Sequence, residues 1–140
     1  MKGIGTTTDK STISDNMTDF NGGGIENGGT LTITGASIIS ANSADIGGGI
    51  RTEGGSSLNI TASTIWGNSA DSNAGGIYIV PGGNPGTPVI GGSSTELKNK
   101  ICGNFLSGNS PSLDQQIRDS SGDLYNIYKV NNNISIYCIF

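Results

Sequence analysis

The stretches STISDNMTDFNGGGI (11–25), SIISANSADIGGGI (37–50) and STIWGNSADSNAGGI (63–77) decide the fold, because they are three copies of one pattern. Successive copies begin 26 residues apart, and each closes on a glycine run followed by isoleucine. A repeat of this length is too short to bury its own apolar face, so it must stack on its neighbours. The shared positions are Ile13, Ile39 and Ile65; Asn16, Asn42 and Asn68; Asp19, Asp45 and Asp71.

Each repeat predicts three short strands. LTIT (31–34) alternates apolar and polar residues as a half-buried strand does, and LNIT (58–61) repeats it 27 residues later. The second strand holds the first shared isoleucine, and the third holds the isoleucine after the glycine run. Stacking puts each strand beside its own copy in a parallel sheet, with right-handed connections. We expect an all-β protein, a right-handed parallel β-helix solenoid of about four coils of roughly 26 residues each.

The chain of 140 residues fits a single domain with three parts. Residues 11–80 form the regular coils. Residues 81–117 form a degenerate coil with insertions, in which ICGN (101–104) and DQQI (114–117) take the places of the asparagine and glycine motifs. Residues 118–140 form an irregular C-terminal cap.

The composition excludes two classes of partner. The formal net charge is −4, with no histidine and no cluster of lysine or arginine, so we expect no nucleic-acid binding. No apolar stretch approaches the ~18 residues of a transmembrane helix. The first ten residues lack the apolar centre of a signal peptide, so secretion would require a leader already removed or a longer chain.

The asparagine and glycine positions have structural explanations. Asparagine tolerates the left-handed conformation of a sharp corner, and stacked identical amides hydrogen-bond along a column. We therefore interpret Asn16, Asn42 and Asn68 as a structural ladder. The glycine runs allow positive φ and close approach between coils.

The GGGI run combined with an I-x-x-N tetrad (13–16, 39–42 and 65–68) resembles the right-handed parallel β-helix repeats of secreted and cell-surface microbial proteins. The polymorphic outer-membrane proteins of chlamydiae are similar, with GGAI and F-x-x-N patterns. Here isoleucine replaces phenylalanine and glycine replaces alanine, so the resemblance is to the repeat type. It covers residues 11–80 well and 87–117 loosely. It implies an extracellular or cell-surface location, adhesion, and contact with carbohydrate or with a host or neighbouring surface.

Cys102 and Cys138 lie outside the regular repeats, and neither has a nearby cysteine or histidine with which to bind zinc. They either form a disulfide that ties the C-terminal part together in an oxidising compartment, or remain two small buried thiols. We favour the disulfide.

The aspartate column is the sharpest chemical feature. Asp19, Asp45 and Asp71 would repel one another unless they are solvated, cap backbone groups, or share a cation. Ca²⁺ is the candidate, with oxygen from Asn21 or Asn73. The nonapeptide of calcium β-rolls is missing, so we favour solvated, turn-forming aspartates and expect no cofactor.

Four residues are candidates for ligand contact. Trp66 and Tyr78 are expected on outer positions, where an aromatic ring could stack on a sugar or pack beneath the 80–88 insertion. Thr32 and Asn59 belong to a polar strand face that could meet ice or crystalline glycan. The competing explanation is that these are ordinary outward residues of a solvated sheet.

The expected function is a secreted or surface module with a structural or adhesive role. The alternative is a small polysaccharide-active lyase or hydrolase of the pectin lyase-like architecture, or a fragment of one. The carboxylates Asp15, Glu26, Glu53 and Asp114 show no catalytic cluster by spacing, and no histidine can relay a proton, so we assign no catalytic residue. We expect open strand edges at the N-terminal end to favour self-association.

Overall fold

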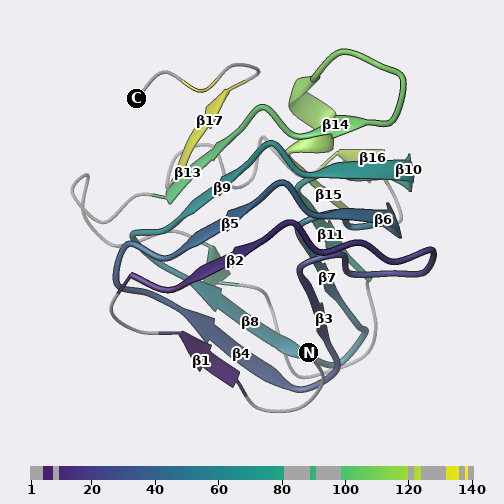
Figure 1. The fold of residues 1–140 in the computed structure, drawn as a ribbon. Helices are drawn as coiled ribbons and strands as arrows, with labels where there is room; N and C mark the ends of the chain where they lie inside the picture. Colours follow the sequence, from purple (N-terminus) through teal and green to yellow (C-terminus); the bar gives the residue numbers. More distant parts are fainter. Residues whose placement is uncertain are drawn as a thin grey trace.

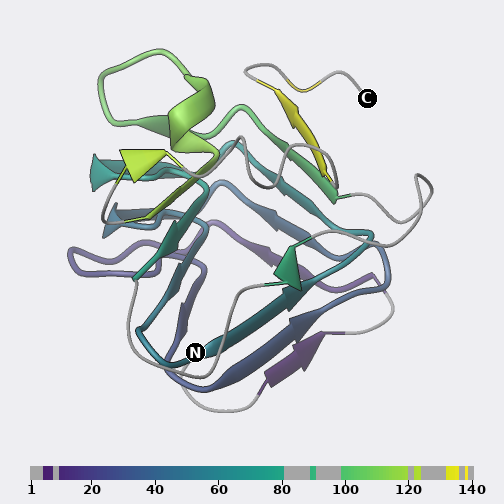
Figure 2. The same cartoon turned by 180° about the vertical axis from the view of Figure 1, so that it is seen from behind.

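The computed structural model describes residues 5–7, 10–80, 89–90, 99–119, 122–123, 132–135 and 138. Apart from one short 3₁₀ helix, Leu113–Gln115, the regular elements there are β-strands, so the all-β expectation is confirmed. Figures 1 and 2 show the strands gathered into stacks, each built from strands of successive repeats. No helix in the described ranges is long and apolar enough to cross a membrane.

Within the described residues the strands form four sheets, which we name A to D. Sheet A orders β1 (Gly5–Thr7), β4 (Thr30–Ile33), β8 (Ser57–Ile60) and β12 (Val89–Ile90). Sheet B orders β2 (Thr12–Ser14), β5 (Ile38–Ser40), β9 (Thr64–Trp66), β13 (Asn99–Cys102) and β17 (Asn132–Ser135). Sheet C orders β6 (Ser43–Ile46), β10 (Ser69–Asn73) and β14 (Phe105–Leu106). Sheet D orders β3 (Ile25–Asn27), β7 (Ile50–Thr52), β11 (Ile77–Ile79), β15 (Ile117–Asp119) and β16 (Gly122–Asp123).

Every pairing between these strands is parallel except β15 with β16, which is antiparallel. From β4 to β15 the chain visits sheets A, B, C and D in turn and then begins again, one strand further along each sheet. Parallel pairing requires this kind of crossover, because a tight hairpin can join only antiparallel strands. The arrangement is compatible with the expected β-helix.

Sheet C corrects the expectation of three strands per repeat. The segments that carry Asp45 and Asp71 are extended and paired, whereas the sequence pattern indicated turns there. The first repeat reaches this sheet only through isolated bridges, Met17 to Ser43 and Asn21 to Ile46. Aspartate is a poor strand former, but these short strands are held by their neighbours on both sides.

The core consists of branched aliphatic side chains stacked in register. The two isoleucine columns expected from the repeats are confirmed, and each continues into the fourth repeat, which supplies Ile101 and Ile117. Ile13 at the N-terminal end is only partly buried. The described isoleucine and leucine residues with at most 1% exposure are Ile25, Leu31, Ile33, Ile39, Ile50, Leu58, Ile60, Ile65, Ile77, Ile101 and Ile117. Burying each such side chain contributes roughly 1.5–3 kcal/mol.

Candidate functional site

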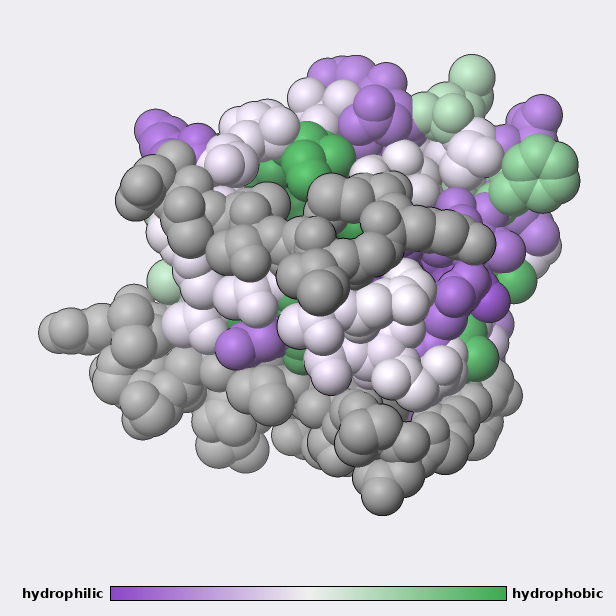
Figure 3. Space-filling model, turned by 90° about the horizontal axis from the view of Figure 1, so that it is seen from below, coloured by the Kyte–Doolittle hydropathy of each residue, from purple (hydrophilic) through white to green (hydrophobic). Residues whose placement is uncertain are grey.

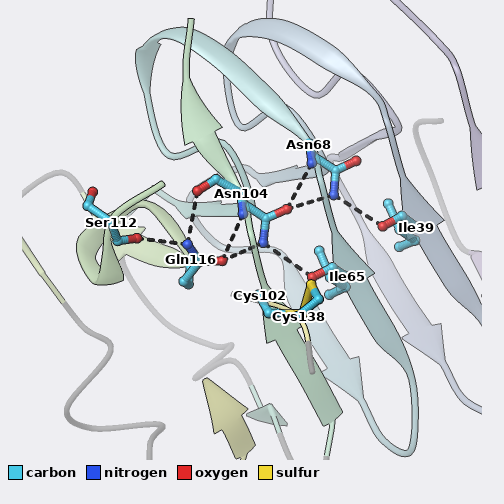
Figure 4. Close-up of a disulfide and its surroundings, with 8 residues drawn as sticks. All are labelled: Ile39, Ile65, Asn68, Cys102, Asn104, Ser112, Gln116 and Cys138. Carbon is cyan, nitrogen blue, oxygen red and sulfur yellow. Dashed lines mark hydrogen bonds between the residues drawn. A yellow bond between two sulfur atoms is a disulfide. The ribbon is translucent and has the colours of Figure 1, made fainter. Parts of the chain in front are cut away.

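A line of side-chain amides runs along the corner between sheets B and C. Asn16 Nδ2 donates to Asn42 Oδ1 at 2.9 Å, and Asn42 Nδ2 donates to Asn68 Oδ1 at 3.0 Å. Asn68 Nδ2 donates to Asn104 Oδ1 at 2.9 Å, as Figure 4 shows. The expected structural ladder is therefore present, and we call it the amide ladder. Its interior members Asn42, Asn68 and Asn104 are fully buried, so each stacked amide satisfies its neighbour.

The C-terminal end of the amide ladder is closed by a residue that the sequence reasoning missed. Gln116 Oε1 accepts from the side chain of Asn104 at 2.7 Å and from its backbone N–H at 3.1 Å. Gln116 Nε2 donates to the backbone oxygens of Asn104 and Ser112 (Figure 4). Gln116 immediately precedes Ile117, where the other repeats have glycine. The signal was present in DQQI (114–117), which replaces GGGI.

The last glycine of each GGGI run makes room for the amide ladder. A Cβ on Gly24 would lie 2.7 Å from the oxygen of Gly49 and 3.0 Å from Asn42 Nδ2. Gly49 faces Asn68 in the same way, and Gly76 faces Asn104. The GGGI and I-x-x-N motifs are thus two halves of one packing arrangement.

The left-handed corner lies one residue earlier than expected. The residues with positive φ at this turn are Asp15 (60°), Ala41 (54°), Gly67 (63°) and Gly103 (61°), each immediately before the ladder asparagine. The asparagines themselves are not among the positive-φ residues. The asparagine is selected for its stacked hydrogen bonds, and the preceding position carries the backbone strain.

The two cysteines form a disulfide, which settles the choice between a disulfide and two thiols. Cys102 and Cys138 are joined with their Cα atoms 5.2 Å apart, closing a separation of 36 residues. Cys102 ends β13 and pairs in register with Trp66 on β9. The disulfide therefore fastens a C-terminal residue to sheet B beside the chain's single tryptophan.

Trp66 is exposed as expected, with 40% of its surface accessible, whereas Tyr78 is not. Tyr78 retains 9%, because it is the middle residue of β11 between Arg51 of β7 and Arg118 of β15. Tyr78 keeps the outward position that alternation gives it between Ile77 and Ile79, but the expectation of an accessible ring is wrong. The 81–88 segment beneath which both rings could pack lies outside the described residues.

The structure brings together two carboxylates that the sequence left scattered. Glu26 Oε1 lies 3.0 Å from Arg51 Nη1, and Glu53 Oε1 lies 3.7 Å from the same nitrogen. Glu26 and Arg51 are register partners on β3 and β7. All three side chains are partly exposed, so this is a solvated ion-pair group on sheet D. Of the other carboxylate candidates, Asp15 is an exposed turn residue, and the side chain of Asp114 lies outside the description.

Thr32 and Asn59 are register neighbours on β4 and β8, as the repeat predicts. Thr30 and Ser57 pair beside them on the same strands. Figure 3 views the molecule from the side of sheet A, where the described atoms are largely near-white, the colour of intermediate hydropathy. The register column runs from Thr6 of β1 through Thr32 and Asn59 to Val89 of β12, so the polar row ends at β12.

The aspartates of the repeat do not share one register position. Strand β10 shifts register between Ala70 and Asn73, and Asp45 Oδ1 accepts a hydrogen bond from Ser72 Oγ. In the described ranges, no three His, Cys, Asp or Glu side chains are grouped as a metal site requires. The geometry at Asp19, Asp45 and Asp71 therefore gives the calcium hypothesis no support.

The predicted ligand residues do not converge on one site. Thr32 and Asn59 lie on sheet A, Trp66 on sheet B and Tyr78 on sheet D. The exposed aromatic ring of Trp66 and the polar row of sheet A are separate surfaces. Comparisons with protein-family models, with curated proteins and with solved structures find no match to this chain.

Proposed function

We propose that this chain is a right-handed parallel β-helix of about four coils, and that it serves as a structural or adhesive module at a cell surface or outside the cell. The amide ladder carries the proposal. Side-chain amides join the described repeats from Asn16 to Asn104 and end at Gln116, so side chains specify the register of the stack. That organisation suits a rigid scaffold that presents its outer faces.

The disulfide supports the extracellular location. Disulfides persist in oxidising compartments and are rare where glutathione and thioredoxin keep thiols reduced. The Cys102–Cys138 link bridges β13 to a residue beyond β17. A covalent tie is most useful there, because the amide ladder has already ended at Gln116.

We propose that the module contacts carbohydrate through the outward face of sheet B. Trp66 is 40% exposed, and its indole ring offers a flat apolar surface. On the neighbouring strands its register partners are Ser40 and Cys102, so the ring stands beside small side chains.

The test is a panel of soluble polysaccharides and oligosaccharides, titrated against the oxidised protein by calorimetry. Trp66→Ala is expected to weaken binding by about tenfold or more, because a buried aromatic contact contributes on the order of 1–2 kcal/mol or more. Asn59→Ala on sheet A is the matched control and should bind as the unmodified chain does. Equal loss in both variants, or no binding by the unmodified chain, would overturn contact through Trp66.

The same samples distinguish adhesion from the alternative, a small polysaccharide lyase or hydrolase. New reducing ends or unsaturated products would establish the enzyme. Glu26→Gln and Glu53→Gln would then test the two carboxylates that lie beside Arg51. Binding without product formation supports the structural and adhesive role.

A further inference from the structure

The amide ladder has a direction, so its two ends are chemically different. Each interior asparagine accepts at Oδ1 from the side-chain amide and the backbone N–H of the preceding ladder asparagine; Asn68 receives both from Asn42 at 3.0 Å. Each also donates from Nδ2 back to a backbone oxygen of the preceding repeat, as Asn42 does to Ile13 and Asn68 to Ile39. Each Oδ1 therefore accepts only from the N-terminal side, whereas each Nδ2 donates to both neighbouring repeats.

The first repeat lacks two of the hydrogen bonds that the later repeats make. Asn16 Oδ1 accepts no hydrogen bond within the described part of the chain, and Asn16 Nδ2 donates to the backbone oxygen of Ser14, two residues earlier, as well as to Asn42. In later repeats the residue that follows the ladder asparagine donates its N–H to the backbone oxygen of the ladder asparagine one repeat earlier, as Ser43 does to Asn16. Met17 holds that position in the first repeat, and among the described residues its N–H has no such acceptor.

The same end is apolar. Ile13 is partly buried, whereas its column partners Ile39 and Ile65 are at most 1% exposed. Met17 is 82% exposed and Phe20 76%. Figure 1 shows β2 as the outermost strand of sheet B at this end, with β5 as its one described neighbour. We call the surface formed by Ile13, Asn16, Met17 and Phe20 the acceptor end.

A second copy of this chain does not complement the acceptor end. If two acceptor ends faced each other, the side-chain oxygens (Oδ1) of the two Asn16 residues would meet without a donor between them. Both side-chain N–H bonds of each Asn16 are already used within its own chain. At the other end Asn104 is already closed by Gln116. The next sequence tetrad, beginning at Ile134, has Tyr137 where the ladder requires asparagine.

We propose that the acceptor end binds, in trans, a parallel strand of another protein that carries an apolar-x-x-Asn tetrad. The asparagine of the incoming strand donates its backbone N–H and side-chain amide to Asn16 Oδ1, and its carbonyl oxygen accepts from Met17 N–H. The apolar residue of the tetrad covers Ile13. Its carbonyl oxygen replaces that of Ser14 as the acceptor of one Asn16 Nδ2 hydrogen bond. This is strand addition in which main-chain bonds give affinity and the asparagine gives register. It is independent of whether Trp66 binds carbohydrate.

The probe is a synthetic peptide of residues 37–50, the second copy of the repeat, labelled with a dye and titrated against the full oxidised chain. The matched control is the same peptide with Asn42→Ala. We expect the unmodified peptide to bind at least about tenfold more tightly, because tenfold corresponds to the loss of one to two ordinary hydrogen bonds. Hydrogen exchange should slow at the Thr12 and Met17 amides when it binds.

Asn16→Ala in the protein completes a double-mutant cycle. If Asn16 Oδ1 is the acceptor, this variant binds the two peptides equally, while its circular dichroism stays that of the unmodified chain. Three results would overturn the proposal: no binding up to millimolar peptide, equal binding of both peptides by the unmodified protein, or protection away from β2. Sedimentation of the chain alone is the last check, since a dimer abolished by Asn16→Ala would make the occupant a second copy.

Discussion

The two ends of the amide ladder contain the same chemical group in opposite circumstances. Gln116 is fully buried and uses both its oxygen and its nitrogen, whereas Asn16 is exposed and its oxygen accepts nothing among the described residues. A buried amide is costly to leave unpaired, while an exposed one can bond to water. The comparison therefore teaches that the stability of the stack depends on where an amide lies along the ladder.

Substitution in the middle of the amide ladder should have the largest effect. Asn68→Ala removes the acceptor of two buried donors on Asn42, so we expect a loss of roughly 2–5 kcal/mol in the free energy of unfolding. Asn16→Ala should cost less than about 1 kcal/mol, because Asn42 Oδ1 keeps the backbone N–H of residue 16. Urea unfolding followed by circular dichroism measures both.

The contrast has a clear failing outcome. If the two variants lose similar amounts of stability, water replaces the ladder bonds as readily inside the stack as at its end. The loss expected for Asn68→Ala is a large share of the roughly 5–15 kcal/mol by which a domain is stable.

The regular repeats could be predicted from the sequence because their residues act by identity and spacing. The isoleucine columns, the asparagine ladder and the strand pairs of sheets A, B and D all follow from the spacing of the repeats. Sheet C did not follow, since its segments are rich in serine and aspartate and their spacing differs between repeats. The number of residues from ladder asparagine to the GGGI isoleucine changes from nine (Asn16 to Ile25) to eight (Asn42 to Ile50).

Two site residues show why the rest could not be predicted. Gln116 lies only 12 residues after Asn104, so no count of 26 residues leads to it. Gln116 stands where earlier repeats have glycine. Its side chain can occupy that place because Asn104 bonds to Gln116 and not to a further ladder asparagine. Tyr78 is outward by alternation but is covered by its surroundings, and strand periodicity alone does not report that cover.

A smaller effect is expected from crowding the amide ladder without removing an amide. A Cβ on Gly49 would lie 2.8 Å from the oxygen of Gly76 and 3.0 Å from Asn68 Nδ2, so Gly49→Ala should destabilise the chain by roughly 1–3 kcal/mol. Gly28→Ala is the control, because its Cβ would meet Glu53 Oε2, the end of a side chain that can move aside. The control should stay within about 0.5 kcal/mol, measured by the same urea unfolding. Equal effects would mean that the repeats can separate slightly without loss.

The smallest expected effect concerns the turn before the ladder asparagine, where the repeats use different residues for the same left-handed backbone. Ala41 is exposed at φ 54°, and Gly67 occupies the equivalent position at φ 63° with open space around it. Ala41→Gly should stabilise the protein by about 0.5–1 kcal/mol, since relief of the left-handed strain exceeds the added flexibility of the unfolded chain. Gly67→Ala should destabilise it by a similar amount, because the strain is introduced where nothing offsets it. Thermal unfolding should thus raise the midpoint for Ala41→Gly and lower it for Gly67→Ala. The reverse pair of shifts would show that the flexibility of the unfolded chain outweighs the left-handed strain at this turn.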